Sequence, residues 1–324
     1  MDGRDKVAYT VTMASMILAF DVVFPILAYM MVGFIATKKR VWSAETAQTV
    51  NRLIFSIFLP VLLFENIRSV SMDQVLDAHL TAYAVTSVLF TYALLFILVP
   101  RIEKDNSRKG VMIQGIYRSN YIIIGIPMTQ VILGQENIGH TATLIGIIIP
   151  MFNIMGIVAM EVYRDSRIHW GRLLKNVAKN PFVVATFFGF TVLLSGISLP
   201  SFVETSTMSI GRAATPMALV AMGGCFRFEG VKDCLKPLLI SVLGKLILMP
   251  AVWLTVAALL GFRGHAYISL LSLYGAPVAV SSYSIAQQMG GDRELASQIV
   301  VYTSVFSILT LFLITLVTKS LGLY

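Results

Sequence analysis

Ten apolar runs, each long enough to cross a lipid bilayer, constrain this chain more than any other feature of its sequence. A membrane-spanning helix needs about 20 mostly apolar residues. The chain is 56% hydrophobic and only 13% charged, which no soluble domain of this size requires. We therefore predict an all-α polytopic membrane protein with spans over 9–36, 46–68, 79–99, 111–134, 140–163, 181–198, 202–225, 235–260, 265–289 and 295–318.

The basic residues of the connections predict the orientation of these spans, because cytoplasmic loops carry an excess of Lys and Arg. With the N-terminus outside, the inner connections hold 17 basic residues and the outer ones 5. Both termini are then expected outside. The net charge of +8 follows from these loops, so it gives no reason to expect nucleic acid as a partner.

One apolar span contains the sequence QGIYRSNYIIIGIPMTQ, which places Arg118, Ser119 and Asn120 together and follows them with Gly125 and Pro127. A cation at membrane depth is costly and normally faces protein or a water-filled cavity. Proline removes a backbone donor, and the freed groups need new partners. The stretch predicts a discontinuous helix at a transport site. A proline kink that only shapes helix packing is the alternative explanation.

The connection over 164–180 is the longest and most basic, and we interpret it as a cytoplasmic linker containing a short amphipathic helix. Five spans precede it in residues 1–163 and five follow in residues 181–324. An odd number of spans reverses the orientation of the second half, as in inverted repeats. Helix-breaking or hinge residues also stand at matching positions of the halves: Pro60 with Pro216, and Gly125 and Pro127 with Gly275 and Pro277.

The ninth span repeats the pattern of a mid-membrane break followed by polar residues. Gly275 and Pro277 lie near its middle, and Ser281, Ser282 and Tyr283 follow. Proline suits the first turn of a new helix, where its missing donor costs nothing. We therefore expect a second half-helix to begin here, with its polar side chains lining a site.

Two broken helices would bring two half-helix N-termini together near the midplane, where their free N–H groups favour an anion. Ser119 or Asn120 could cap the first of these half-helices. Arg118 has no obvious buried carboxylate partner, and an anionic substrate would supply that charge. Lys245, about ten residues into the eighth span, is a further candidate for substrate binding, although a buried lysine is more often paired or snorkelling.

The sequence contains no motif of an enzyme. HExxH, GxSxG, a Walker loop and a Cys/His ligand cluster are all missing, and the four histidines are scattered over loops and interfaces. We therefore expect neither catalysis nor a bound metal or cofactor.

Four motifs spread over nearly the whole chain resemble the auxin efflux carrier family, which includes the plant PIN-type carriers: NRLIFSIFLPVLLF, YRSNYIIIGIPMTQVILG, GKLILMP and YGAPVAVSSYSIAQQMGGD. The resemblance implies ten helices in two inverted five-helix repeats, similar to bile acid symporters, with helices 4 and 9 unwound and crossing at the substrate. It also implies a scaffold domain from helices 1, 2, 6 and 7 and a transport domain from helices 3–5 and 8–10. The resemblance further implies that the protein moves organic anions by an elevator-like motion. It also implies a homodimer formed through the scaffold domain, in a bacterial inner membrane.

Carried over to this sequence, the crossing falls at Ser119 and Asn120 in one helix and at Pro277 in the other. Ser119 stands where the plant carriers have proline, Arg118 precedes it, and Val278 replaces a polar residue. The plant carriers also have charged residues within the third span, which this chain lacks. An extra cation at the crossing favours a small carboxylate, such as malate or malonate, over an auxin-like indole acid.

We therefore predict a secondary transporter of a small organic anion that works by alternating access. Arg118 and Asn120 would contact the carboxylate, and Ser281, Ser282 and Tyr283 would line the site. Two alternatives stay open: a sodium- or proton-coupled symporter of another organic anion, and a membrane sensor that binds the anion without transport. A buried acidic residue in the transport domain would favour proton coupling, and the sequence offers none.

Overall fold

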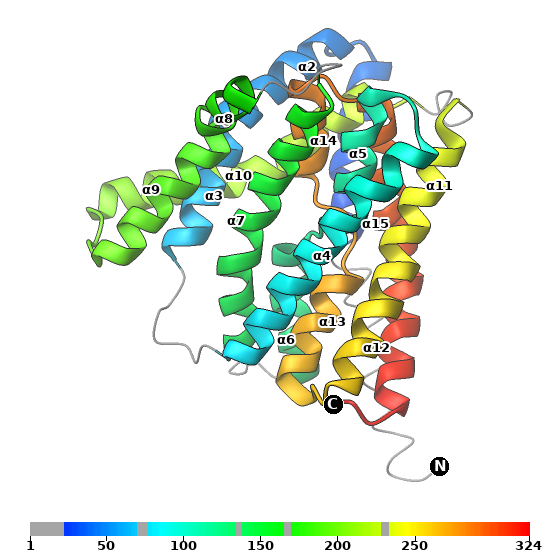
Figure 1. Ribbon diagram of the computed structural model, residues 1–324. Coiled ribbons are helices and arrows are strands. Elements are labelled where there is room, and N and C mark those ends of the chain that lie inside the picture. The colour runs from blue at the N-terminus through cyan, green and yellow to red at the C-terminus, as the bar shows by residue number, and fades with distance from the viewer. Residues whose placement is uncertain (1–22, 70–76, 134–137, 165–169, 228–232) are drawn as a thin grey trace.

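The computed structural model describes residues 23–69, 77–133, 138–164, 170–227 and 233–324, and within these ranges it contains helices and no strand (Figure 1). Two parts of the sequence predictions lie outside the described residues: the beginning of the first span, over 9–22, and residues 165–169 of the linker. Apart from these residues and residue 134, each predicted span is occupied by helix, with boundaries that differ by a few residues and with interruptions at 118–120 and 276–280.

The helices that run without interruption are Val23–Lys38, α4 (Ala78–Ile102), α7 (Gly139–Val162), α9 (Pro181–Ser195), α10 (Ser201–Cys225) and α15 (Arg293–Ser320). Two more contain one π-helical turn each: α2 (Ala44–Leu53), η1 (Ile54–Phe58) and α3 (Leu59–Arg68), and α11 (Leu235–Leu243), η3 (Gly244–Leu248) and α12 (Met249–Leu259). Two spans are broken, into α5 (Asn106–Tyr117) and α6 (Tyr121–Leu133), and into α13 (Gly264–Gly275) and α14 (Ser281–Gln288). The amphipathic helix predicted in the linker is α8 (Trp170–Ala178).

Five of the described helices are long and apolar enough to cross a membrane: Ala44–Arg68, Ala78–Ile102, Gly139–Val162, Leu235–Leu259 and Arg293–Ser320. Large apolar side chains such as Phe90, Phe187 and Leu259 are exposed on the surface of the protein. Extensive apolar surface of this kind is unfavourable in water and suits a hydrocarbon environment. The fold is therefore that of an α-helical membrane protein.

The helices form two groups that meet around α7 and α14. In the first group α3 packs against α9 and α10, and these helices lie together at the left of Figure 1. The second group holds α4–α6, α11–α13 and α15, on the other side of the molecule. Helix α7 contacts α3 and α9 as well as α5, and α14 contacts α2 and α10 as well as α15. Through α14, one of the two broken spans therefore lies where the groups meet.

Three of the prolines expected at helix breaks or hinges lie within continuous helix. Helix α6 runs through Gly125 and Pro127, and α10 runs through Pro216. Pro60 follows the π-helical turn η1 as the second residue of α3, within an uninterrupted helix. A membrane helix tolerates one missing donor because neighbouring groups and local adjustments satisfy the freed carbonyl. The interruption of the fourth span lies instead at Arg118–Asn120, before Pro127.

Candidate functional site

The two broken helices cross through their extended segments. Backbone dihedral angles turn from helical to extended at Arg118, with ψ 136°, and at Ala276, with ψ 145°. The Asn120 N–H donates a hydrogen bond of 2.7 Å to the carbonyl oxygen of Pro277. This hydrogen bond joins the two segments where each of them is interrupted.

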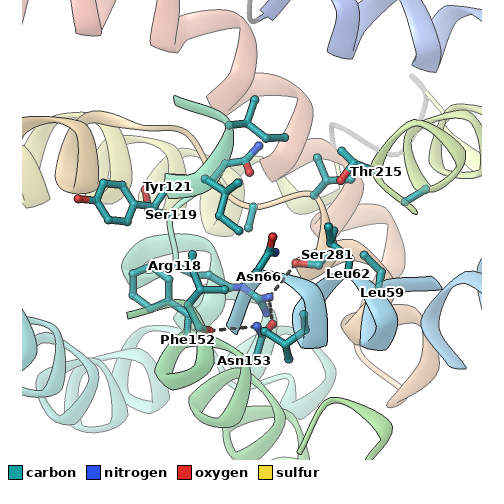
Figure 2. Close-up of a pocket in the computed structure, with 18 of the residues that line it drawn as sticks. Leu59, Leu62, Asn66, Arg118, Ser119, Tyr121, Phe152, Asn153, Thr215 and Ser281 are labelled. Atoms are coloured by element: carbon teal, nitrogen blue, oxygen red, sulfur yellow. Dashed lines mark hydrogen bonds between the residues drawn. The ribbon is translucent and has the colours of Figure 1, made fainter. Parts of the chain in front are cut away.

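A cavity of about 120 Å³ lies beside this crossing (Figure 2). Its volume suits several water molecules or a small anion. Residues 121–123 at the start of α6 and Ser281 at the start of α14 line it, so both half-helix N-termini face the same space. The helix dipole at these ends favours negative charge. The remaining walls are contributed by Leu59, Leu62, Leu63, Asn66, Arg118, Ser119, Asn120, Ile149, Phe152, Asn153, Phe182, Thr215, Ala218, Ala279 and Val280.

Arg118 supplies the positive charge of this cavity and is only 2% exposed. Its Nη1 donates to Gln114 Oε1 at 3.2 Å, and its Nη2 donates to Ser281 Oγ at 2.7 Å and to Asn153 Oδ1. Figure 2 shows Asn153 of α7 and Ser281 of α14 bonded to the guanidinium. All of these acceptors are neutral, and burying a cation without a counter-charge is unfavourable. Among the described residues, the guanidinium therefore has no counter-charge within hydrogen-bond distance.

Ser119 and Asn120 line the cavity beside Arg118, as the sequence predicts for a binding site. Ser119 Oγ and Asn120 Nδ2 have no hydrogen-bond partner among the described residues. Buried polar groups rarely stay unpaired, so such atoms at a cavity are available to a ligand. The helix-capping role expected for one of these side chains is not seen for Ser119, whose hydroxyl makes no bond to α6.

Four of the sequence candidates lie outside the cavity. Pro277 belongs to the extended link rather than to the first turn of a helix, because α14 begins only at Ser281. Ser282 lines a second, much smaller cavity, and Tyr283 is buried elsewhere in the interior. Lys245 is fully buried in η3 and does not line the cavity.

Sequence reasoning missed three polar residues of the site. Asn153 of α7 binds the Arg118 guanidinium, and Asn66 of α3 and Thr215 of α10 also line the cavity. Each is a polar residue within an otherwise apolar span, and this pattern is the only feature of the sequence that points to it as a site residue.

Asn120→Ala is expected to weaken binding of a carboxylate about tenfold, or about 1.4 kcal/mol, because the variant removes an unpaired donor at the cavity. Ser282→Ala is the matched control. It also removes an unpaired buried polar atom, but one outside this cavity, so affinity should not change. Isothermal titration calorimetry in detergent measures both, and equal affinities for the two variants would contradict the assignment.

Two broken helices that cross beside a buried cation, in a helical membrane protein, define a membrane transporter. Within the described part of the chain, no three His, Cys, Asp or Glu side chains are grouped so as to hold a metal ion. Residues 18–315 match the family described as membrane transport protein. The chain belongs to this family, which is the auxin efflux carrier family that its motifs resemble.

Similar proteins agree with this assignment. An uncharacterised transporter of Methanocaldococcus jannaschii is 23% identical over 300 residues, which cover 90% of this chain and 96% of the relative. A Rhizobium meliloti protein, provisionally named a malonate transporter, is 21% identical over 303 residues, which cover 89% and 92%. The sodium proton antiporter NhaP1 of M. jannaschii shares the fold, with a TM-score of 0.59 at 10% identity over 96% of this chain and 99% of that chain. The chain is therefore a transporter and not an enzyme.

Proposed function

We propose that this protein is a secondary transporter of a small carboxylate such as malonate or malate. The observation that carries the proposal is Arg118, a buried cation with only neutral partners that lies between two half-helix N-termini. A planar guanidinium can bind a carboxylate through two parallel hydrogen bonds. The free donors at Ser119 and Asn120 would add further bonds to the same ligand.

The size of the cavity supports a small substrate over an indole acid. A volume of about 120 Å³ accommodates a chain of a few carbon atoms, whereas ligands the size of drugs occupy several hundred cubic ångströms. The malonate named for the Rhizobium relative is of the smaller kind. A substrate larger than the cavity would require the groups around α7 and α14 to separate.

The proposed transport mechanism rests on an inverted repeat of ten transmembrane helices. Residues 1–163 and 181–324 would be the two repeats, joined by the linker over 164–180. Each contains one broken span, α5–α6 in the first and α13–α14 in the second, at corresponding ordinal positions. The charge of the connections supports termini on the outside, in a bacterial inner membrane.

Alternating access would move one group of helices against the other as an elevator. The scaffold would comprise the helix Val23–Lys38 with α2, α3, α9 and α10, and the transport domain would comprise α4–α7 and α11–α15. Exposed aromatic side chains on α9, including Phe187 and Phe188, give the scaffold an apolar surface that a second copy could cover in a homodimer.

Asn51 bonds across the boundary between these two domains. This fully buried residue of α2 donates to Gln287 Oε1 and accepts a hydrogen bond of 2.8 Å from Ser284 Oγ, both of α14. These hydrogen bonds between the two domains would stabilise one position of the transport domain relative to the scaffold. An elevator movement of α14 past α2 would have to break them.

Linking Asn51→Cys to Ser284→Cys with a short bifunctional thiol reagent is expected to stop transport and leave ligand binding intact, because binding needs no domain movement. The background for this pair has both native cysteines replaced by alanine. Arg68→Cys with Glu204→Cys is the matched control, since that ion pair of 3.0 Å joins α3 and α10 within the scaffold. Transport that continues after complete linkage of the first pair would contradict the elevator movement.

A thermal-shift screen tests the substrate class. A ligand that binds only the folded protein raises its apparent stability by mass action. We expect stabilisation by malonate or malate at millimolar concentration and none by indole acids or by amines of similar size. Stabilisation by an amine, with no response to any carboxylate, would contradict the anion proposal.

A further inference from the structure

Lys245 is a buried amine that takes no part in the proposed substrate site. Its side chain is 0% exposed, and its Nζ has no hydrogen-bond partner among the described residues. It lies in the π-helical turn η3 in the middle of a 25-residue span. π-Helical turns are uncommon and occur often at functional sites.

The turn that carries Lys245 packs directly on the broken helix that carries Arg118. A Cβ atom built on Gly244 would lie 3.2 Å from Ile116 Cγ1, only two residues before Arg118. Helices α13 and α15 also contact η3. Lys245 therefore lies next to α5, close to the crossing of the two broken helices. It does not line the substrate cavity at that crossing.

Among the described residues, no acidic group is placed to compensate the charge of Lys245. The titratable residues on the helices packed against η3 are Arg108, Lys109 and Tyr117 on α5, Lys236 on α11, His265, Tyr267 and Tyr274 on α13, and Arg293, Glu294, Tyr302 and Lys319 on α15. The single carboxylate among them, Glu294, is in the first turn of α15. The tyrosine hydroxyls of α5 and α13 bond to Phe152 O, Leu254 O and Ser87.

Whether Lys245 is protonated should therefore depend on the charge of the substrate bound at the helix crossing. An isolated ammonium in a dry interior is unfavourable, whereas the neutral amine is tolerated there. A dicarboxylate bound at Arg118 brings two negative charges against one positive charge, and the excess negative charge favours a proton on Lys245. The bound site is then neutral overall, with two negative charges on the substrate and one positive charge on each of the two residues.

We propose that Lys245 is a proton-binding site through which this protein carries a dianionic dicarboxylate together with one proton. This inference rests on the proposed carboxylate transport. It narrows the substrate class, because a monocarboxylate is already neutralised by Arg118 and would move without a proton. The coupling group is then a buried base rather than the buried acid that proton coupling usually suggests.

The test uses malonate uptake into proteoliposomes, with and without an inward proton gradient. For the wild type we expect the gradient to accelerate uptake at least about fivefold, since each dianion must bring a proton. Lys245→Met keeps an unbranched side chain and removes the amine, so uptake should continue down its own gradient but lose the response to protons. Lys236→Met, an exposed lysine on the same span, should respond like the wild type.

A second measurement does not depend on the folding of the variant. Calorimetric titration of the wild type with malonate, in buffers of different ionisation enthalpy, gives the number of protons taken up on binding. We expect about one proton per malonate and none per acetate. A value near zero for malonate, or a Lys245→Met variant that still responds fully to the proton gradient, would overturn the role of Lys245 alone. A wild type that neither binds nor moves any carboxylate would instead overturn the proposed function and this inference with it.

Discussion

Arg118→Ala is expected to lower the affinity for malonate at least about thirtyfold, which corresponds to about 2 kcal/mol. Among the described residues that line the cavity, the guanidinium is the only cation, and its neutral partners cannot replace it as a ligand for a carboxylate. Truncating one member of a buried charge pair typically costs 2–5 kcal/mol, so this should exceed the effect of any other single change at the site. Calorimetric titration measures the affinity.

Two further variants make this result specific to the guanidinium. Arg212→Ala removes another cation from a membrane span, but an exposed one outside the cavity, and should leave affinity unchanged. Arg118→Lys keeps the charge and loses the planar fork, so an intermediate loss is expected. If Arg118→Ala still folds and binds malonate within about threefold of the wild type, Arg118 is not the carboxylate ligand.

Gly223→Ala is expected to destabilise the protein by about 3 kcal/mol or more, or to prevent folding. A Cβ atom on Gly223 would lie 2.0 Å from the carbonyl oxygen of Met30, and one on Gly33 would lie 1.9 Å from that of Val220. Replacing glycine by alanine within a helix normally gains up to about 1 kcal/mol in helix propensity. Here the clash is with backbone, which cannot turn aside as a side chain can, so the overpacking cost should dominate.

The control for this prediction is Gly171→Ala in α8, where the added methyl group meets nothing within 4 Å. Its thermal midpoint should stay constant or rise slightly. Thermal unfolding in detergent, followed by size-exclusion chromatography, reports both variants. A Gly223→Ala protein with the midpoint of the wild type would show that the first helix and α10 are not packed this closely.

Much of the fold follows from the sequence because apolar length and polar interruptions are local signals. The polar residues at 118–120 mark the break between α5 and α6, and Gly275 ends α13 as expected. The prolines were less informative. Whether Pro127 or Pro216 breaks a helix depends on the partners that surrounding helices provide, and those exist only in the folded protein.

The site could be predicted only in part, because the folded packing decides which polar residues face the cavity. Arg118, Ser119, Asn120 and Ser281 do come together at one cavity. Ser282, next to Ser281, points to a different space because successive helical residues are turned by about 100°. Sequence shows that these residues are polar but not where α14 begins, so it cannot tell which of them face the cavity. Asn66 and Thr215 belong to the site only through the packing of α3 and α10 on the crossing.

Carboxylate transport through the site at Arg118 is tested most directly by uptake of labelled malonate into proteoliposomes containing the wild type or Arg118→Ala. We expect saturable uptake by the wild type, competition by unlabelled malate but not by an indole acid, and near-background uptake by the variant. Binding without uptake by the wild type would make this protein a sensor rather than a transporter. Equal uptake by Arg118→Ala would place the anion site away from the helix crossing.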